Sequence, residues 1–422
     1  MTTTKRPFSS KVGIAGLWLV MAVSVGVSAE DWPRWRGPRG DGTWFGPAVP
    51  LDWKTDSREP VWEQKVHAGY SGISVADGRV YTMDRVTEPE ESERVICFDA
   101  RDGAELWVDR YPVTYGKLDY GKGPRATVTI DRGRAYALGA VGHLRCLDAK
   151  TGALLWSKDL KAEYQAQQPT WGFAAAPLIH QDLVIVHVGA KPNGCYLAFD
   201  RVSGKEKWRG GSDPTGYGAP IVVKHSGITQ LIGWTPEHIV GLNIASGEVL
   251  WKQPYKVTYG VSIATPIFHQ QTVVVCGYWE GSKAIRLGAD PRQSALLWEE
   301  NRYLRGIMSQ PLYRGGYGYL LDKGHGLVCF ELATGKMKWT DKHQLTPRNR
   351  NPQANLIWLG DSDRALALNA EGTLVQMRLS PEGFQELGRL QIIGETWAHP
   401  AFAGSHIYAR DDERLVCVRI TE

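Results

Sequence analysis

The sequence lacks most of the short motifs by which common enzyme classes are recognised. Its 422 residues contain no Gly-x-Ser-x-Gly, no phosphate-binding P-loop, no Rossmann glycine fingerprint between a strand and a helix, and no His-x-x-x-His pair. A Cys-x-x-Cys-His haem attachment site is absent as well. These absences argue against the corresponding hydrolases, nucleotide-binding enzymes and c-type cytochromes, but they leave open sites that distant residues build together.

Clusters of basic residues and a second long apolar run are also missing. The formal net charge is +4, and three of the positive charges, Lys5, Arg6 and Lys11, belong to the N-terminal segment, so the remainder carries about +1. A nearly neutral chain without basic patches gives no electrostatic reason to expect a nucleic-acid partner. Apart from residues 12–27, no segment is long and apolar enough to suggest a membrane span.

The N-terminus has the three parts of a secretory signal peptide. Basic residues precede the apolar segment 12–27, and Val27-Ser28-Ala29 fits a small-x-small cleavage site. We therefore predict a signal peptide over residues 1–29, cleavage after Ala29, and a periplasmic or secreted mature protein without a membrane span. The alternative is an uncleaved membrane anchor, for which the apolar segment is short and rich in small residues.

Phe is scarce, with 9 residues, whereas Trp is unusually abundant, with 17. Much of the excess comes from a repeat in which Asp148, Thr151-Gly152 and Trp156 have counterparts along most of the chain. The Trp residues of successive copies are 41 to 52 residues apart, and they are Trp62, Trp107, Trp156, Trp208, Trp251, Trp298 and Trp339. A period in the forties with strand-rich units is typical of a β-propeller.

The repeat also predicts the number of blades. Each copy carries four strand signals, and Asp-x-x-Thr/Ser-Gly predicts a tight turn between the last two. Six Trp-ended units run from Trp107 to Trp339, a seventh follows, and the chain then ends after only three more strands. Val61–Val66 resembles an outer strand with no repeat before it. We predict an all-β, eight-bladed propeller of four-stranded antiparallel blades over residues 61–422, with this N-terminal strand closing the last blade.

Six Cys in an exported chain would ordinarily suggest disulfides. Four of them, Cys97, Cys146, Cys329 and Cys417, occupy one position in different repeats. Equivalent strands of separate blades lie too far apart for a bridge, which needs Cα atoms within about 7 Å. We predict free thiols that are buried in the β-layers.

Residues 30–60 contain Trp32, Trp35, Trp44 and Trp53 among Pro, Gly and Arg, without a helix or strand period. Four exposed Trp side chains would make the protein prone to aggregate. We predict that this Trp/Pro-rich segment packs as an extended strap across the propeller. The alternative is an exposed tail that binds a partner.

The repeat Asp-x-x-Thr-Gly-x-x-x-Trp resembles the tryptophan-docking motif of propellers related to pyrroloquinoline quinone (PQQ) enzymes. Gly123–Thr127, Trp171–Pro177 and Asp31–Pro38 are also similar to an exported bacterial family of PQQ-binding-like β-propeller repeat proteins. The resemblance covers essentially the whole mature chain and implies the propeller fold. It does not decide the function, because this scaffold serves both quinoprotein dehydrogenases and non-enzymatic proteins such as the lipoprotein subunit of the outer-membrane β-barrel assembly machine.

Loops that run from the outer strand of one blade to the inner strand of the next should meet at one face, around the channel mouth. We predict ligand contacts from aromatic and basic residues of these loops, namely Arg125, Trp171, Tyr217, Tyr259, Arg305, Arg350, Trp397 and His399. Planar rings and guanidinium groups suit a planar or anionic ligand such as a quinone, a sugar or a peptide. The alternative for each residue is that it fills a crowded channel entrance.

The sequence does not support a complete quinoprotein active site. By the resemblance, such an enzyme would have adjacent Cys residues, Ca²⁺ ligands and an Asp base, but no two Cys are adjacent and acidic residues are scarce near the inner-strand starts. We predict a scaffold without catalytic residues, metal or cofactor, which takes an unknown protein partner or a small-molecule or glycan ligand. The alternatives are a PQQ- and Ca²⁺-dependent dehydrogenase of alcohols or sugars, or another enzyme that acts on sugars.

Overall fold

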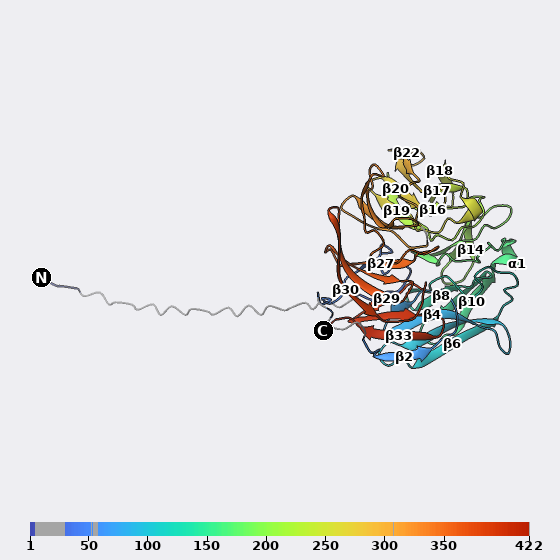
Figure 1. The fold of residues 1–422 in the computed structure, drawn as a ribbon, viewed down its shortest axis with the longest axis horizontal. Coiled ribbons are helices and arrows are strands. Elements are labelled where there is room, and N and C mark those ends of the chain that lie inside the picture. The colour runs from blue at the N-terminus through green and yellow to red at the C-terminus, as the bar shows by residue number, and fades with distance from the viewer. Residues whose placement is uncertain (5–29, 52, 54–57, 307, 422) are drawn as a thin grey trace.

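The computed structural model describes residues 1–4, 30–51, 53, 58–306 and 308–421. Nearly all of the predicted signal peptide lies outside this part of the chain, so its cleavage stays a prediction. The strands of the described residues form eight sheets that follow one another round a ring, together with a short helix, α1 (Leu160–Tyr164) (Figure 1). Among the residues described, no helix has the length and apolarity needed to cross a membrane.

Seven blades are antiparallel meanders of four strands that are consecutive in the sequence. The first four of these blades contain β3 (Ser74–Ala76), β4 (Arg79–Val86), β5 (Ser92–Asp99) and β6 (Glu105–Pro112); β7 (Thr129–Asp131), β8 (Arg134–Leu138), β9 (His143–Asp148) and β10 (Leu154–Asp159); β11 (Leu178–His180), β12 (Leu183–His187), β13 (Tyr196–Asp200) and β14 (Glu206–Gly210); and β15 (Ile221–His225), β16 (Ile228–Trp234), β17 (His238–Asn243) and β18 (Val249–Pro254). The next three contain β19 (Ile267–His269), β20 (Thr272–Cys276), β21 (Ser282–Leu287) and β22 (Ser294–Glu300); β23 (Leu312–Arg314), β24 (Tyr317–Asp322), β25 (Gly326–Glu331) and β26 (Met337–Thr340); and β27 (Ala354–Leu359), β28 (Arg364–Asn369), β29 (Thr373–Ser380) and β30 (Gly383–Gln391).

The eighth blade joins the two ends of the chain. It contains β31 (Ala401–Ala403), β32 (His406–Arg410) and β33 (Arg414–Arg419), and its outer strand is β2 (Trp62–Lys65) from the N-terminal side. β2 pairs antiparallel with β33, with Trp62 opposite Cys417, and Figure 1 shows the two strands side by side. The predicted eight-bladed propeller, closed by an N-terminal strand, is therefore confirmed.

The first strand of each blade lies nearest the centre of the ring. β3 contacts the first strands of both neighbouring blades, β31 and β7, and β7 in turn contacts β11. These short strands line the central channel. Every connection between blades consequently enters the ring from the same end of the channel.

The repeated Trp residues join each blade to the next. The indole Nε1 of Trp107 donates to the carbonyl of Ala149, 3.1 Å away in the turn of the following blade, and its ring covers Gly152. The same donation recurs in the pairs Trp62–Ala100, Trp156–Arg201, Trp208–Ile244, Trp298–Leu332 and Trp339–Ser380. Trp251 departs from the pattern and donates to Gln230, because the next blade carries a degraded copy of the turn.

Replacing Gly152 with Ala is expected to destabilise the protein by about 1–3 kcal/mol more than replacing Gly133 with Ala. Both glycines have left-handed backbone, with φ of +76° and +74°, so both variants share a conformational strain of about 1–2 kcal/mol. A Cβ atom at Gly152 would lie 2.7 Å from the ring of Trp107, whereas one at Gly133 would meet nothing within 4 Å. Urea unfolding measures the difference, and equal losses would contradict Trp docking as the reason for the repeated glycine.

All six Cys are unpaired and buried, as predicted. Cys97 and Cys146, for example, lie in the third strands of their blades, β5 and β9, with side chains fully covered. Burial raises the pKa of Cys97 to about 12 and also raises that of Cys146. These thiols are therefore core side chains that stay protonated at neutral pH, rather than nucleophiles.

The Trp-rich segment follows the inner strands of several blades. Trp32 bridges Val75 of β3, and β1 (Thr43–Trp44) pairs parallel with Trp358 and Leu359 of β27, which makes that blade five-stranded. The indoles of Trp32 and Trp44 are 0% and 1% exposed, and both rings pack on Phe402. The segment thus occupies space inside the channel, where it joins the core of the blades around it.

Candidate functional site

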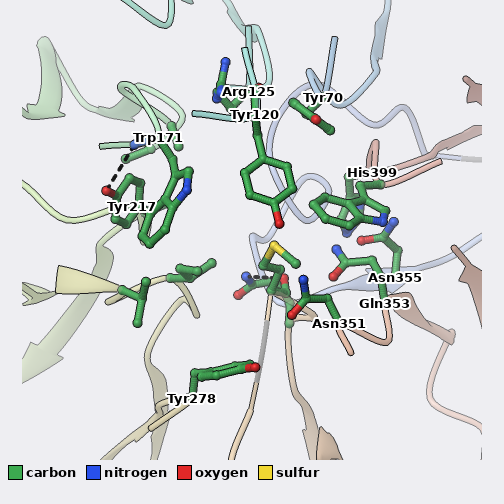
Figure 2. A pocket seen from close by; sticks show the side chains of 18 of the residues that line it. Tyr70, Tyr120, Arg125, Trp171, Tyr217, Tyr278, Asn351, Gln353, Asn355 and His399 are labelled. Atoms are coloured by element: carbon green, nitrogen blue, oxygen red, sulfur yellow. Dashed lines mark hydrogen bonds between the residues drawn. The ribbon is translucent and has the colours of Figure 1, made fainter. Parts of the chain in front are cut away.

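The connections between blades, which we call the inter-blade loops, surround a cavity of about 610 Å³ at one end of the channel (Figure 2). Each of the eight loops contributes at least one lining side chain, represented by Tyr70, Tyr120, Trp171, Tyr217, Tyr259, Met308, Asn351 and Trp397. The volume is in the range of sites that hold drug-sized ligands. The propeller therefore gathers side chains from its whole sequence at a single place.

Seven of the eight residues predicted from the sequence line this cavity: Arg125, Trp171, Tyr217, Tyr259, Arg350, Trp397 and His399. Arg305 is not among the lining residues. Its backbone N–H donates to Asp322 Oδ2 at 2.7 Å, and its guanidinium lies beside Gly324. The geometry brings the seven together, and their role in binding stays a proposal.

Aromatic rings form two groups in the lining. Trp171 packs on Tyr217 with ring centroids 5.6 Å apart, while Tyr70 and Tyr120 both pack on Trp397 at 5.7 Å. In the view of Figure 2, the ring of Tyr120 lies between the Trp171 side and the His399 side of the cavity. The cavity therefore presents aromatic faces from opposite sides of the ring of blades.

The charged lining residues of the described chain are all basic. Lys323 Nζ lies 4.0 Å from the ring centroids of both Tyr278 and Trp279, and Arg350 is exposed at the rim. Arg125 donates to backbone carbonyls of its own loop, and burial without a carboxylate partner lowers its pKa. Because no Asp or Glu is among the described residues that line it, the cavity is electrostatically suited to an anion.

Amide side chains make up much of the remaining polar lining. Gln310, Asn349, Asn351, Gln353 and Asn355 all face the cavity; Asn349, Asn351 and Gln353 come from the loop that leads into β27, and Asn355 lies at the start of β27 itself. Gln353 is 4% exposed, and its Oε1 has no hydrogen-bond partner. Lys323 and these amides are not among the residues predicted from the sequence; the run of Asn and Gln over residues 349–355 was the available signal.

Trp35 brings the N-terminal segment into the cavity wall. Its Nε1 donates to Thr265 Oγ1 at 3.0 Å, and its ring centroid lies 4.8 Å from that of His399. His399 Nδ1 lies 3.0 Å from the carbonyl of Pro400, which fits a neutral ring with the proton on Nδ1. Burial lowers the pKa of His399 to about 4, so the imidazole is neutral at physiological pH.

The buried histidines should make the protein sensitive to acid. Burial lowers the pKa of both His187 and His399 to about 4, below the unfolded value of about 6.5. As the pH falls below 6.5, the unfolded chain binds protons first, so stability present above this pH is lost progressively down to pH 4. At pH 5 the loss is roughly 2 kcal/mol per histidine.

His399→Gln is therefore expected to lose less unfolding free energy than the wild type between pH 7.5 and pH 5, by roughly 2 kcal/mol. Urea titrations of both proteins at the two pH values measure this difference. Equal losses would contradict a buried, neutral His399.

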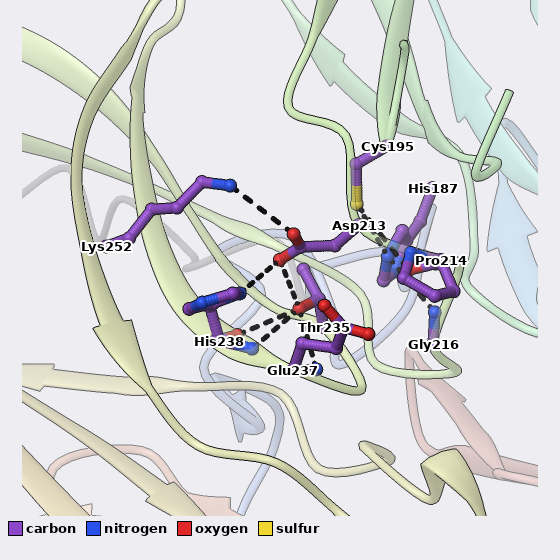
Figure 3. A network of polar contacts seen from close by, with 9 residues as sticks. All are labelled: His187, Cys195, Asp213, Pro214, Gly216, Thr235, Glu237, His238 and Lys252. Carbon is purple, nitrogen blue, oxygen red and sulfur yellow. Dashed lines mark hydrogen bonds and ion pairs between the residues drawn. The ribbon is translucent and has the colours of Figure 1, made fainter. Parts of the chain in front are cut away.

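A polar network lies beside the loop that carries Tyr217 (Figure 3). Asp213 accepts hydrogen bonds from Thr235 Oγ1 at 2.8 Å and from His238 Nδ1 at 2.9 Å, and Lys252 Nζ lies 3.3 Å from its other oxygen. Burial alone would raise the pKa of Asp213, but the bonds from Thr235 and His238 outweigh it and lower the pKa. Glu237 lies close enough to Asp213 and His238 for the three side chains to form a set of metal ligands, but both Asp213 oxygens already have partners. The network anchors the loop to β16–β18.

Comparisons with known proteins identify the fold and two kinds of relative. A family model described as outer membrane protein assembly factor BamB matches residues 91–341, more than half of the chain. Outer membrane protein assembly factor BamB of Moranella endobia (strain PCIT) is 25% identical over 329 residues, which cover 71% of this chain and 78% of that protein. Quinohemoprotein alcohol dehydrogenase ADH-IIG of Pseudomonas putida is 32% identical over 142 residues, which cover 32% of this chain but only 18% of the enzyme.

The solved structure of a quinohemoprotein alcohol dehydrogenase from Comamonas testosteroni aligns with a TM-score of 0.64 and 12% identity. The alignment covers 92% of this chain and 80% of that enzyme. At this identity the similarity concerns the propeller fold alone. The chemistry of the cavity has to be argued from its own residues.

Proposed function

Because the chain belongs to the PQQ-like β-propeller family whose model is described as outer membrane protein assembly factor BamB, we propose that it is an exported, non-catalytic scaffold that binds a ligand or a protein partner at its channel mouth. The observation that carries this proposal is the convergence of all eight inter-blade loops on one cavity. Exposed aromatic and basic side chains at its rim are suited to binding, since they supply contact area and charge without needing a reactive group.

The alternative, a PQQ- and Ca²⁺-dependent dehydrogenase, has less support from the residues present. Ca²⁺ takes six or more oxygen ligands, usually with carboxylates among them, and the described lining of the cavity offers only neutral amide oxygens and hydroxyls. No two Cys are adjacent in the sequence, and the six thiols are buried in the blades. The donor set thus does not fit a calcium–quinone centre.

A cofactor titration separates the two functions. The protein cleaved after Ala29 would be mixed with PQQ and Ca²⁺ and assayed for dye-coupled oxidation of alcohols and sugars. The scaffold proposal expects no turnover above the rate without protein. Micromolar PQQ binding together with sustained oxidation would overturn it.

Binding at the cavity is tested with a variant at its rim. Trp279→Ala combined with Arg350→Gln removes one exposed ring and one exposed cation, whereas Arg132→Gln changes an exposed cation in the hairpin between β7 and β8, away from the inter-blade loops. Material captured from an envelope extract should fall at least tenfold with the double variant and be unchanged with Arg132→Gln. Equal capture by all three proteins would contradict a binding role for the cavity.

Export is tested by the sequence of the mature N-terminus. If residues 1–29 form a signal peptide, protein recovered outside the cytoplasm should begin at Glu30. Edman degradation of that fraction gives the answer directly. A protein that retains Met1 or remains in the cytoplasmic fraction would contradict the proposed export.

A further inference from the structure

Three large rings at the cavity rim are unusually exposed. Tyr259, Tyr120 and Trp279 are 75%, 51% and 45% exposed. The first two also have left-handed backbone, with φ of 57° and 50°, a conformation that costs a Tyr about 1–2 kcal/mol. Exposed aromatic rings and strained backbone are typical of binding sites, where a bound ligand covers the rings.

Amide groups with unused hydrogen-bonding capacity face these rings. Gln353 is nearly fully buried and its Oε1 lacks a partner. Asn355 Nδ2 donates to the Ala398 carbonyl, and within the described residues no hydrogen bond reaches the Asn355 side-chain oxygen. An amide both donates and accepts, so its natural complement is a group that does both. Hydroxyl groups do so, whereas a quinone or a bare carboxylate only accepts and would leave the amide oxygens unpaired.

The charge of the lining adds a third requirement. Lys323 and Arg350 face the cavity, and no carboxylate among the described lining residues balances them. The Lys323 ammonium lies over two ring faces. In the described chain the backbone N–H of Arg350 donates to Asn349 Oδ1, while no ion pair or hydrogen bond engages its guanidinium. Such cations favour an anionic ligand.

We propose that the cavity binds a short oligosaccharide that carries carboxylate or sulfate groups. The rings pack on the C–H faces of the sugars, whose weakly positive hydrogens suit the negative face of an aromatic ring. Gln353 and Asn355 bind hydroxyl groups, and Lys323 and Arg350 bind the acidic groups. This inference rests on the proposed scaffold function and specifies the class of its ligand.

The test uses isothermal titration of the mature protein with matched pairs of sugars. One pair is trigalacturonate and its methyl ester, and the other is a sulfated galactose tetrasaccharide and its desulfated form. At least one acidic sugar should bind ten times more tightly than its neutral match, and its affinity should fall with added salt. If neither acidic sugar binds more tightly than its match, the inference is wrong.

Variants connect the binding to the named residues. Arg350→Gln should weaken the acidic sugar at least fivefold and bring its affinity closer to that of the neutral match. Gln353→Met keeps the side-chain volume but removes the hydrogen-bonding group, so it should weaken both members of a pair without lowering the melting temperature. Arg132→Gln, remote from the cavity, should change neither affinity. Unchanged affinities in the two cavity variants would place any sugar binding elsewhere and contradict the proposal.

The outcomes also separate this inference from the scaffold proposal. If Trp279→Ala with Arg350→Gln abolishes capture from the envelope extract while no acidic sugar binds, the scaffold proposal stands and its ligand is not an acidic sugar. Capture of a protein that depends on the cavity residues, without binding of an acidic sugar, would lead to the same conclusion. If capture and sugar binding are both insensitive to the cavity variants, the scaffold proposal fails as well.

Discussion

Deleting Glu59–His67 is expected to abolish folding and to leave the protein in the insoluble fraction. This segment contains β2, whose backbone pairs with β33 and closes the ring. It also contains Trp62, whose Nε1 donates to the carbonyl of Ala100 in the first blade. Without it, β33 becomes an unpaired edge strand, which invites pairing between molecules. Expression followed by fractionation and circular dichroism of any soluble material measures the effect.

The matched control keeps the strand and changes only its outward side chains. Glu63 and Lys65 are exposed, so the double variant Glu63→Ala, Lys65→Ala should stay soluble with a melting temperature close to that of the wild type. A soluble deletion protein with an unchanged melting curve would refute the role of β2 in ring closure.

Trp44→Ala is expected to lower the unfolding free energy by about 3–5 kcal/mol. The indole is 1% exposed in the channel, packs on Phe402, and belongs to β1, which adds a strand to the inner edge of β27. Removing it leaves a cavity among three structural units that cannot easily collapse: the N-terminal segment and two blades. Guanidinium unfolding monitored by circular dichroism measures the loss.

Trp279→Ala is the control for this effect, since it removes the same side chain from an exposed position at the cavity rim. Its unfolding free energy should change by about 0.5 kcal/mol or less. If Trp44→Ala were equally mild, the N-terminal segment would not be part of the folded core.

The fold could be predicted from the sequence because its determinants are local and repeated. Asp148 and Gly152 form their turn through contacts within a few residues, and Asp148 accepts bonds from the backbone of Lys150 and Thr151. Trp156 then falls at a constant distance along the chain. The strand around Trp62 shows the same Trp pattern but has no repeat unit before it. It could therefore be assigned to the last blade, which predicted how the ring closes.

The path of the N-terminal segment could not be predicted in the same way. Its contacts connect residues far apart in sequence, such as Trp35 with Thr265 and Arg36 with the carbonyl of Pro311. No periodicity reports such contacts. The sequence therefore indicated that these indoles need cover, but not that Trp35 would form part of the cavity wall.

The sequence predicted several of the aromatic residues that line the cavity, but it predicted the basic lining residues incompletely. Arg305 lies in an inter-blade loop, but Asp322 holds its backbone and its side chain lies beside Gly324 instead of lining the cavity. Lys323, in the neighbouring turn, lines the cavity instead because Tyr278 and Trp279 attract its ammonium. Side-chain direction in such loops depends on contacts between blades, which a single sequence does not reveal.

The most direct test of a functional channel mouth is site-specific photo-cross-linking in the producing cells. A photoreactive amino acid would be placed at position 350, on the cavity rim, and in a second protein at position 132, in the hairpin between β7 and β8. The expected result is a cross-linked ligand or partner at position 350 and none at position 132. Cross-links at position 132 alone, equal yields at both positions, or none at either would contradict binding at the channel mouth.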